Sequence, residues 1–183
     1  METIQQPPPG AVIASAVIAV VLQLVVAPAI TLFGVVPNFI LATVIITAIH
    51  NGPVRSVVMG FVLGLVFDFC SLGPLGAMTL VLTILSYAVS SLNKGVFTGG
   101  IVVDMIILLA ALIAGEFLIS VIYAIVGANP EFLLSLVQRV LPAIAYDALI
   151  GLILMIIYNA IVGDSSFRSG GGTGRSLTRK LHL

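Results

Sequence analysis

Long apolar runs separated by short polar breaks dominate the sequence. Six runs lie at about residues 11–30, 36–49, 54–69, 77–92, 100–126 and 136–162. Gly, Pro, Asn and charged residues fill the breaks, as is typical of turns between helices. Because a helix needs roughly 20 apolar residues to cross a bilayer, the pattern predicts six transmembrane helices. The second run is the shortest and predicts a tilted or partly re-entrant helix, with Pro37 at its first helical position.

The two ends of the chain differ from the apolar middle. Residues 1–10 are polar and Pro-rich, which predicts an extended lead. Residues 163–183 are Gly-rich and basic, which predicts a disordered cytoplasmic tail. Residues 27–29 (APA) loosely fit a signal-peptide cleavage site, but the segment before the first run carries Glu2 and no Lys or Arg. We therefore interpret the first run as a retained span, and residues 11–162 as one six-helix transmembrane domain.

Composition agrees with a lipid environment. The chain of 183 residues is 60% hydrophobic and 8% charged, whereas a soluble domain is about 25% charged. Too few charges are present to cover a soluble globule, so the fold class predicted is an all-α integral membrane protein. A formal net charge of zero argues against nucleic-acid binding. Cys70 is the only cysteine, which excludes an intramolecular disulfide and a thiolate metal cluster.

The positions of Lys and Arg predict the orientation. With six spans, the turns at Arg55 and Lys94 share one side of the membrane with the N-terminus and the basic tail. The opposite side carries only Arg139. Because cytoplasmic loops are enriched in basic residues, we expect both termini in the cytoplasm.

Small residues in the third run indicate a packing face. Ser56, Gly60, Gly64 and Asp68 recur at four-residue steps, and the two glycines let another helix approach closely. Packing within the chain is favoured over a contact with a partner's helix, and both interpretations stay open. Glu116 and Ser120 form a second such face on the fifth run.

Polar and ionisable residues inside the runs are candidate functional residues, because they are costly at membrane depth unless paired. We expect most of them to form an internal network, with a ligand or partner contact as the alternative. No HExxH, GxSxG or P-loop motif occurs, and neither histidine has a companion at ligand spacing. We therefore predict no enzyme activity, no cofactor and no metal site. The expected network comprises Gln23, Tyr87, Tyr123, Arg139 and Asp147.

Several short motifs occur in a characteristic order. Residues 37–41 (PNFIL) precede residues 60–68 (GFVLGLVFD) and 71–76 (SLGPLG), and Ser86-Tyr87 follows. This order resembles the rod shape-determining protein MreD family, whose members carry a Pro-Asn or Pro-Asp, a GFxxGxxxD segment and a turn ending in Leu-Gly. The match covers about residues 37–87, with Gln23 and Leu141-Pro142 as weaker agreements. The turn departs from the commoner Ser-Gly, and the tail is long.

The resemblance implies helix starts and a turn at Pro37, Asn38, Ser71 and Gly76, with Asp68 stabilising the turn. It also implies a non-catalytic scaffold in the bacterial plasma membrane. Such a protein would bind a bitopic MreC protein and link MreB filaments to RodA and a class B penicillin-binding protein. The family resembles the substrate-binding subunits of energy-coupling-factor vitamin transporters in its six-helix arrangement. A vitamin-binding subunit, with a pocket lined by Glu116, Tyr123, Tyr146 and Asp147, is therefore the alternative function.

Overall fold

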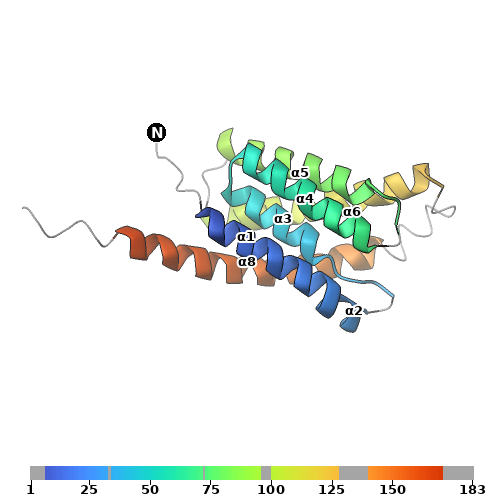
Figure 1. Ribbon diagram of the computed structural model, residues 1–183, viewed down its shortest axis with the longest axis horizontal. Coiled ribbons are helices and arrows are strands. Elements are labelled where there is room, and N and C mark those ends of the chain that lie inside the picture. Colours follow the sequence, from blue (N-terminus) through green and yellow to red (C-terminus); the bar gives the residue numbers. More distant parts are fainter. Residues whose placement is uncertain (1–6, 33, 72, 96–99, 128–139, 171–183) are drawn as a thin grey trace, which may run out of the picture.

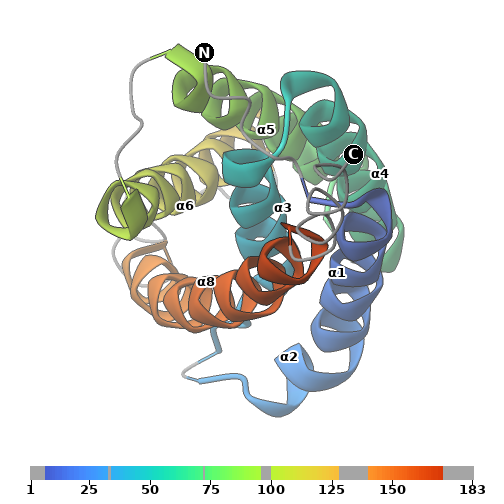
Figure 2. The same ribbon diagram turned by 90° about the vertical axis from the view of Figure 1, so that its left-hand side faces the viewer.

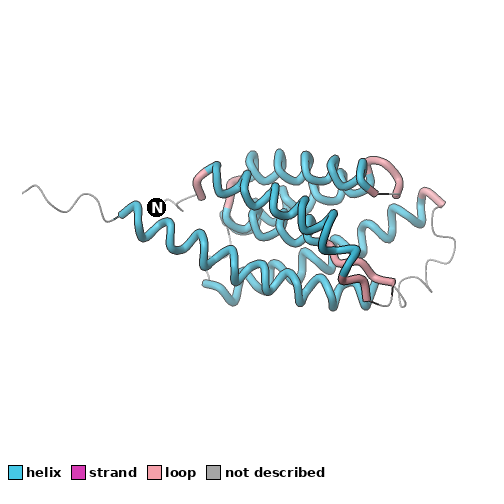
Figure 3. Tube along the Cα trace, turned by 60° about the horizontal axis from the view of Figure 1, so that its bottom comes forward, coloured by secondary structure: helices cyan, strands magenta, loops and turns pink. Residues whose placement is uncertain are grey.

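The computed structural model describes residues 7–32, 34–71, 73–95, 100–127 and 140–170. Every regular element in these ranges is helical, and the one β-type pairing is an isolated bridge between Leu32 and Val35. Figure 3 shows the helices running along the bundle, with loops at its two ends. The elements are α1 (Pro9–Val21), the π-helix η1 (Leu22–Val26), α2 (Ala27–Ala29), α3 (Phe39–His50), α4 (Pro53–Cys70), α5 (Ala77–Gly95), α6 (Gly100–Ile125) and α8 (Leu141–Gly170).

Helix α3 lies in the middle of the bundle. Figure 2 shows it surrounded by α1, α4, α5, α6 and α8, and it contacts all five. Every residue of α3 from Phe39 to Ile49 is buried. The surrounding helices expose large apolar side chains on their outer faces, including Ile13, Val58 and Val102. An apolar exterior around a packed interior is the arrangement expected of a protein solvated by lipid.

Among the described residues, four helices are long and apolar enough to cross a membrane: Pro9–Ala29, Pro53–Cys70, Gly100–Ile125 and Leu141–Ile161. The apolar parts of α3 and α5 are shorter. Together these are the six helices predicted from the sequence, and the chain is a multi-pass membrane protein (Figure 1). The cytoplasmic placement of the termini stays a prediction.

The central helix covers only part of the bilayer depth. Its 12 residues give a length of about 18 Å at 1.5 Å per residue, against about 30 Å for a hydrocarbon core. The predicted short second helix is therefore present, but it begins later than expected. Pro37 precedes the helix instead of occupying its first position, because the Asn38 side chain caps α3 by accepting the Leu41 N–H.

Helices α4 and α5 pack closely through the glycine face. A Cβ on Gly60 would lie 2.6 Å from the Leu82 carbonyl oxygen, and a Cβ on Gly64 would lie 2.5 Å from the Thr79 Cα. Only glycine permits this approach. The face is filled by a helix of the same chain, so packing replaces a partner helix as our interpretation of these two residues.

The helix boundaries differ from the predicted ones at the C-terminal end. Helix α8 begins at Leu141 and continues to Gly170, beyond the predicted domain end at residue 162. We predict disorder in residues 163–183; residues 163–170 instead continue α8, and residues 171–183 lie outside the described residues. Arg139 also lies outside them.

Candidate functional site

The N-terminus of α3 is capped by side chains from its own start and from a distant helix. The first four N–H groups of any helix lack partners within that helix. In α3 the Leu41 N–H donates to Asn38 Oδ1 at 3.0 Å, and the Asn38 N–H donates to Asp147 Oδ1 at 2.8 Å. Asp147 belongs to α8 and is only 1% exposed. Its carboxyl therefore joins the end of the bundle's central helix to α8.

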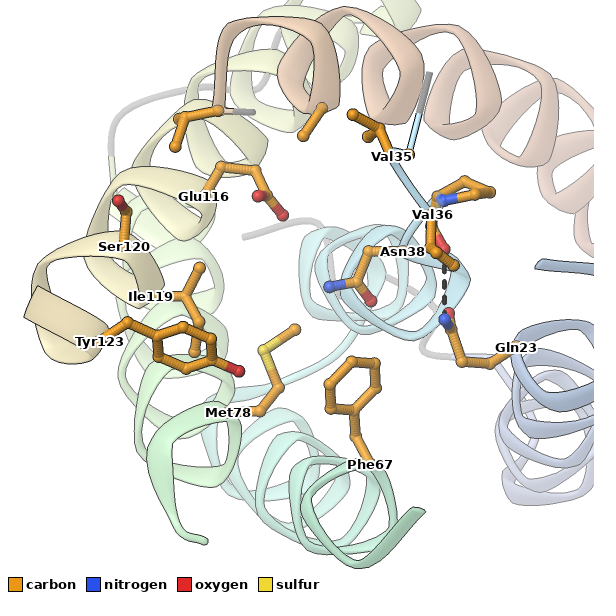
Figure 4. A pocket seen from close by; sticks show the side chains of 14 residues that line it. Gln23, Val35, Val36, Asn38, Phe67, Met78, Glu116, Ile119, Ser120 and Tyr123 are labelled. Atoms are coloured by element: carbon orange, nitrogen blue, oxygen red, sulfur yellow. Dashed lines mark hydrogen bonds between the residues drawn. The ribbon is translucent and has the colours of Figure 1, made fainter. Parts of the chain in front are cut away.

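Gln23 supplies the remaining caps from the first span. Its Oε1 accepts the N–H groups of Phe39 at 2.8 Å and Ile40 at 3.4 Å. Its Nε2 donates to the Pro37 carbonyl at 3.2 Å, the bond drawn in Figure 4. All four N–H groups at the start of α3 are thereby satisfied, which matters in a membrane because unpaired backbone groups there cost several kcal/mol.

The local geometry around Gln23 follows from a proline one turn later. Pro28 has no N–H to offer the preceding turn, and the Ala27 N–H bonds to the Leu22 carbonyl five residues earlier, closing a π-helical turn. Such wider turns inside helices are frequent at functional sites. Here the wide turn includes Gln23, whose side chain reaches α3.

A cavity of about 290 Å³ lies beside this capped helix start. In Figure 4 the Glu116 carboxyl, the Asn38 amide and the Tyr123 phenol point toward the space between the helices. The lining is mixed, with polar groups on one part and apolar side chains on another. It comprises Gln23, Gly34, Val35, Val36, Pro37, Asn38, Phe67, Met78, Glu116, Ile119, Ser120, Tyr123, Val140 and Ala143.

Glu116, which lines the cavity, lies beside a second carboxyl group. The side chain of Glu116 on α6 lies within hydrogen-bonding reach of the Asp147 carboxyl on α8. Two adjacent negative charges at membrane depth would repel, so the closeness of these two acids is costly unless their charge is compensated. The two acids lie 31 residues apart in sequence, and the fold makes them neighbours.

Ser120 and Tyr123 occupy the cavity wall one and two turns beyond Glu116. Ser120 is 6% exposed, and its hydroxyl has no hydrogen-bond partner among the described residues. Tyr123 packs against the turn between α4 and α5, where a Cβ on Gly73 would collide with the Tyr123 hydroxyl. These contacts connect the end of α6 to that turn.

Asp68 lies outside the cavity and caps another helix. Its carboxylate accepts the N–H groups of Gly76, Met78 and Thr79 at 2.9 to 3.0 Å, and the Thr79 hydroxyl at 2.6 Å. Gly76 has a φ of +89°, which favours glycine at the end of the turn. Ser71 C-caps α4 through its N–H, which donates to the Phe67 carbonyl.

One predicted member of the polar network is placed elsewhere. Tyr87 is 60% exposed on α5, so it does not belong to an internal network. The error arose because Tyr87 adjoins Ser86, which is fully buried; adjacent residues on a helix point about 100° apart. Gln23, Tyr123 and Asp147 do lie around the cavity and the α3 start. Arg139, the remaining predicted member, lies outside the described residues.

The apolar part of the lining could not be predicted from the sequence. Phe67, Met78, Ile119 and Val140 line the cavity, but in a chain this apolar they are indistinguishable from packing residues. Tyr146, which the alternative vitamin-binding function would place in a pocket, donates to the Ile30 carbonyl at 2.6 Å and holds α8 against the end of α2.

The fold and the cavity define a class: a multi-pass α-helical membrane protein built around a short, fully capped central helix. Within that class, the family model described as rod shape-determining protein MreD matches residues 9–162. The match spans most of the chain, and the protein therefore belongs to this family. No curated protein and no solved structure matches the chain.

Proposed function

We propose that this protein is a non-catalytic membrane scaffold of the bacterial cell-elongation complex. In this function it binds an MreC-type bitopic protein in the plasma membrane and links MreB filaments to RodA and a class B penicillin-binding protein. The observation that carries the proposal is the family match over residues 9–162, which includes nearly the whole helical bundle. A bundle held by internal caps suits a scaffold, because binding faces on rigid elements stay in register.

The Glu116 and Ser120 face remains a proposed partner contact, in a modified form. Both side chains line a cavity of about 290 Å³, so there is no room for a whole transmembrane helix against them. A partner would instead insert a loop or a side chain. The unpaired Ser120 hydroxyl and the Asn38 amide offer hydrogen bonds to such an insertion.

The same cavity favours a second candidate, the substrate-binding subunit of an energy-coupling-factor vitamin transporter. Its volume is close to the lower end of the roughly 300–1,000 Å³ of small-molecule sites. Polar groups at Glu116 and Tyr123 beside apolar Phe67 and Met78 are the mixed lining that small ligands require.

Crosslinking in native membranes, followed by mass spectrometry of proteins captured with a tagged copy, separates the two candidates. Recovery of MreC and the wall synthases supports the scaffold. Recovery of paired ATPase subunits with a transmembrane coupling subunit overturns it in favour of the transporter. In parallel, a panel of vitamins is tested for thermal stabilisation in detergent, since a ligand that binds only the folded state raises its stability.

A matched pair of variants tests the cavity contact. Ser120→Leu places bulk in the cavity and is expected to lower MreC crosslinking. Val102→Leu on the exposed face of α6 is the control and should leave crosslinking unchanged. Equal crosslinking in both variants would remove the cavity, but not the scaffold function, from the proposal.

A further inference from the structure

A groove lies on the lipid-facing side of the bundle, between α1 and α4. Its volume is about 360 Å³. The groove is separate from the cavity beside α3, because the two lie at opposite ends of α4. Arg55, which lines the groove, is in the first turn of α4, and Phe67, which lines the cavity, is in the last. The groove is lined by Pro9, Val12, Ile13, Ala16, Val54, Arg55, Val58, Met59 and Val62.

The walls of this groove are almost wholly apolar and open to the outside. Val54, Val58 and Val62 of α4 are 80%, 58% and 50% exposed, and Ile13 of α1 is 64% exposed. From Val54 to Val62 the groove follows α4 for about 12 Å at 1.5 Å per residue. Because the surrounding solvent is lipid, a hydrocarbon chain lying along the two helices is the natural filling of such a gap.

The groove carries positive charge at one end. Arg55 is exposed, and the one hydrogen bond its guanidinium makes to the described residues is a long one, 3.5 Å to the Pro7 carbonyl. Of its five N–H donors, the others make no hydrogen bond to the described part of the chain. Arg55 also stands in the first turn of α4, where a helix dipole disfavours a cation unless an anion is nearby.

The start of α4 adds to the attraction for an anion at this end. The N-cap residues of α1 and α4, Pro8 and Gly52, make no side-chain cap. Pro8 and Pro9 have no N–H, and the Ala11 N–H bonds to the Pro8 carbonyl, so α1 adds little to this attraction. The start of α4 adds the N–H groups of Val54 and Arg55, which lie in its first turn, in contrast to α3, whose first N–H groups are all occupied. A groove with apolar walls and a positively charged end suits a ligand that has a hydrocarbon chain and an anionic group.

We propose that the groove between α1 and α4 binds an anionic phospholipid, with an acyl chain between the helices and its phosphate on Arg55. The charge of the site complements a lipid with a net negative headgroup better than a zwitterionic one. An arginine near a membrane surface contributes enough attraction to change lipid affinity about fivefold. The inference is independent of the scaffold function, because it uses neither the cavity nor any partner protein.

The test measures lipid binding to the purified full chain by native mass spectrometry, titrating phosphatidylglycerol and phosphatidylcholine with matched acyl chains. The wild type is expected to bind phosphatidylglycerol about fivefold more tightly. Arg55→Gln should remove this preference and Arg55→Lys should largely keep it. Ala16→Phe, which fills the groove, should weaken binding of both lipids, whereas Val102→Phe on the exposed face of α6 should change neither.

Three results would overturn the proposal. The first is equal affinity of the wild type for both lipids. The second is a preference for phosphatidylglycerol that survives Arg55→Gln unchanged. The third is binding of glycerol phosphate, which has the headgroup chemistry without an acyl chain, as tightly as phosphatidylglycerol, because the apolar groove would then contribute nothing. Because Arg55 is exposed, its two variants are expected to fold, and they decide the question even if Ala16→Phe does not.

Discussion

The bonds made by Asp68 allow a graded prediction of stability. Oδ2 accepts the Gly76 N–H, the Thr79 N–H and the Thr79 hydroxyl, while Oδ1 accepts the Met78 N–H. The side chain is 3% exposed, so water does not replace these bonds when the carboxylate is removed. Asp68→Ala leaves three backbone N–H groups of the α5 start without an acceptor.

The size of the effect can be worked from this geometry. Hydrogen bonds between transmembrane helices average about 0.6 kcal/mol, while bonds to charged groups in soluble proteins reach about 1.5–3 kcal/mol. Four bonds at the lower value already give about 2 kcal/mol, and we expect a loss of about 2–4 kcal/mol for Asp68→Ala. Asp68→Asn keeps one oxygen but turns an NH2 toward a donor, so its loss should be about 1–2 kcal/mol. Thr79→Val removes one bond and should lose about 1 kcal/mol.

The assay is reversible unfolding in detergent followed by circular dichroism, with the thermal midpoint as a second readout. For a chain of this size about 1 kcal/mol corresponds to roughly 2–4 °C, so Asp68→Ala should lower the midpoint by about 4–16 °C. The expected order of loss is Asp68→Ala, then Asp68→Asn, then Thr79→Val. Asp68→Ala and Thr79→Val losing the same stability would refute the capping role, since the backbone bonds would then contribute nothing.

Two further predictions concern the other caps and the glycine face. Gln23→Leu removes the acceptor of two α3 N–H groups and should lose about 1–3 kcal/mol in the same unfolding assay; Ser15→Ala, which removes only a bond to the Val12 carbonyl of its own helix, should lose under about 0.5 kcal/mol. Gly64→Ala forces α4 and α5 apart and should lose about 1–3 kcal/mol, whereas Gly10→Ala meets no atom within 4 Å and should lose none. An unfolding midpoint of Gly64→Ala equal to the wild type would contradict the packing distance.

Hydropathy was enough to predict the helices, because each lipid-crossing segment must satisfy its own backbone and be apolar along its length. The four long spans and the two shorter helices fall where the apolar runs are. The predicted start of α3 was wrong by two residues, because the helix begins at Phe39 and not at Pro37. Asn38 lies between them, and its side chain caps the helix.

The arrangement of the candidate site could not be predicted in the same way. The bond from the Asn38 N–H to Asp147 joins residues 109 positions apart. The sequence around either residue does not indicate that the other is its partner. Tyr87 illustrates the opposite problem. Its hydroxyl suggested an internal role, yet a tyrosine is also compatible with a surface in contact with lipid headgroups, and periodicity alone did not separate the two.

The capping of α3 has a consequence for how the protein is made. During synthesis the α3 segment is made before the α8 segment. The N–H of Asn38, the N-cap of α3, therefore has no Asp147 acceptor until a further 109 residues have been translated. Until the α8 segment arrives, the start of the central helix is incomplete, and a prematurely terminated chain keeps that defect. The start of the central helix is thus completed only after the α8 segment has been made, although α3 itself forms early.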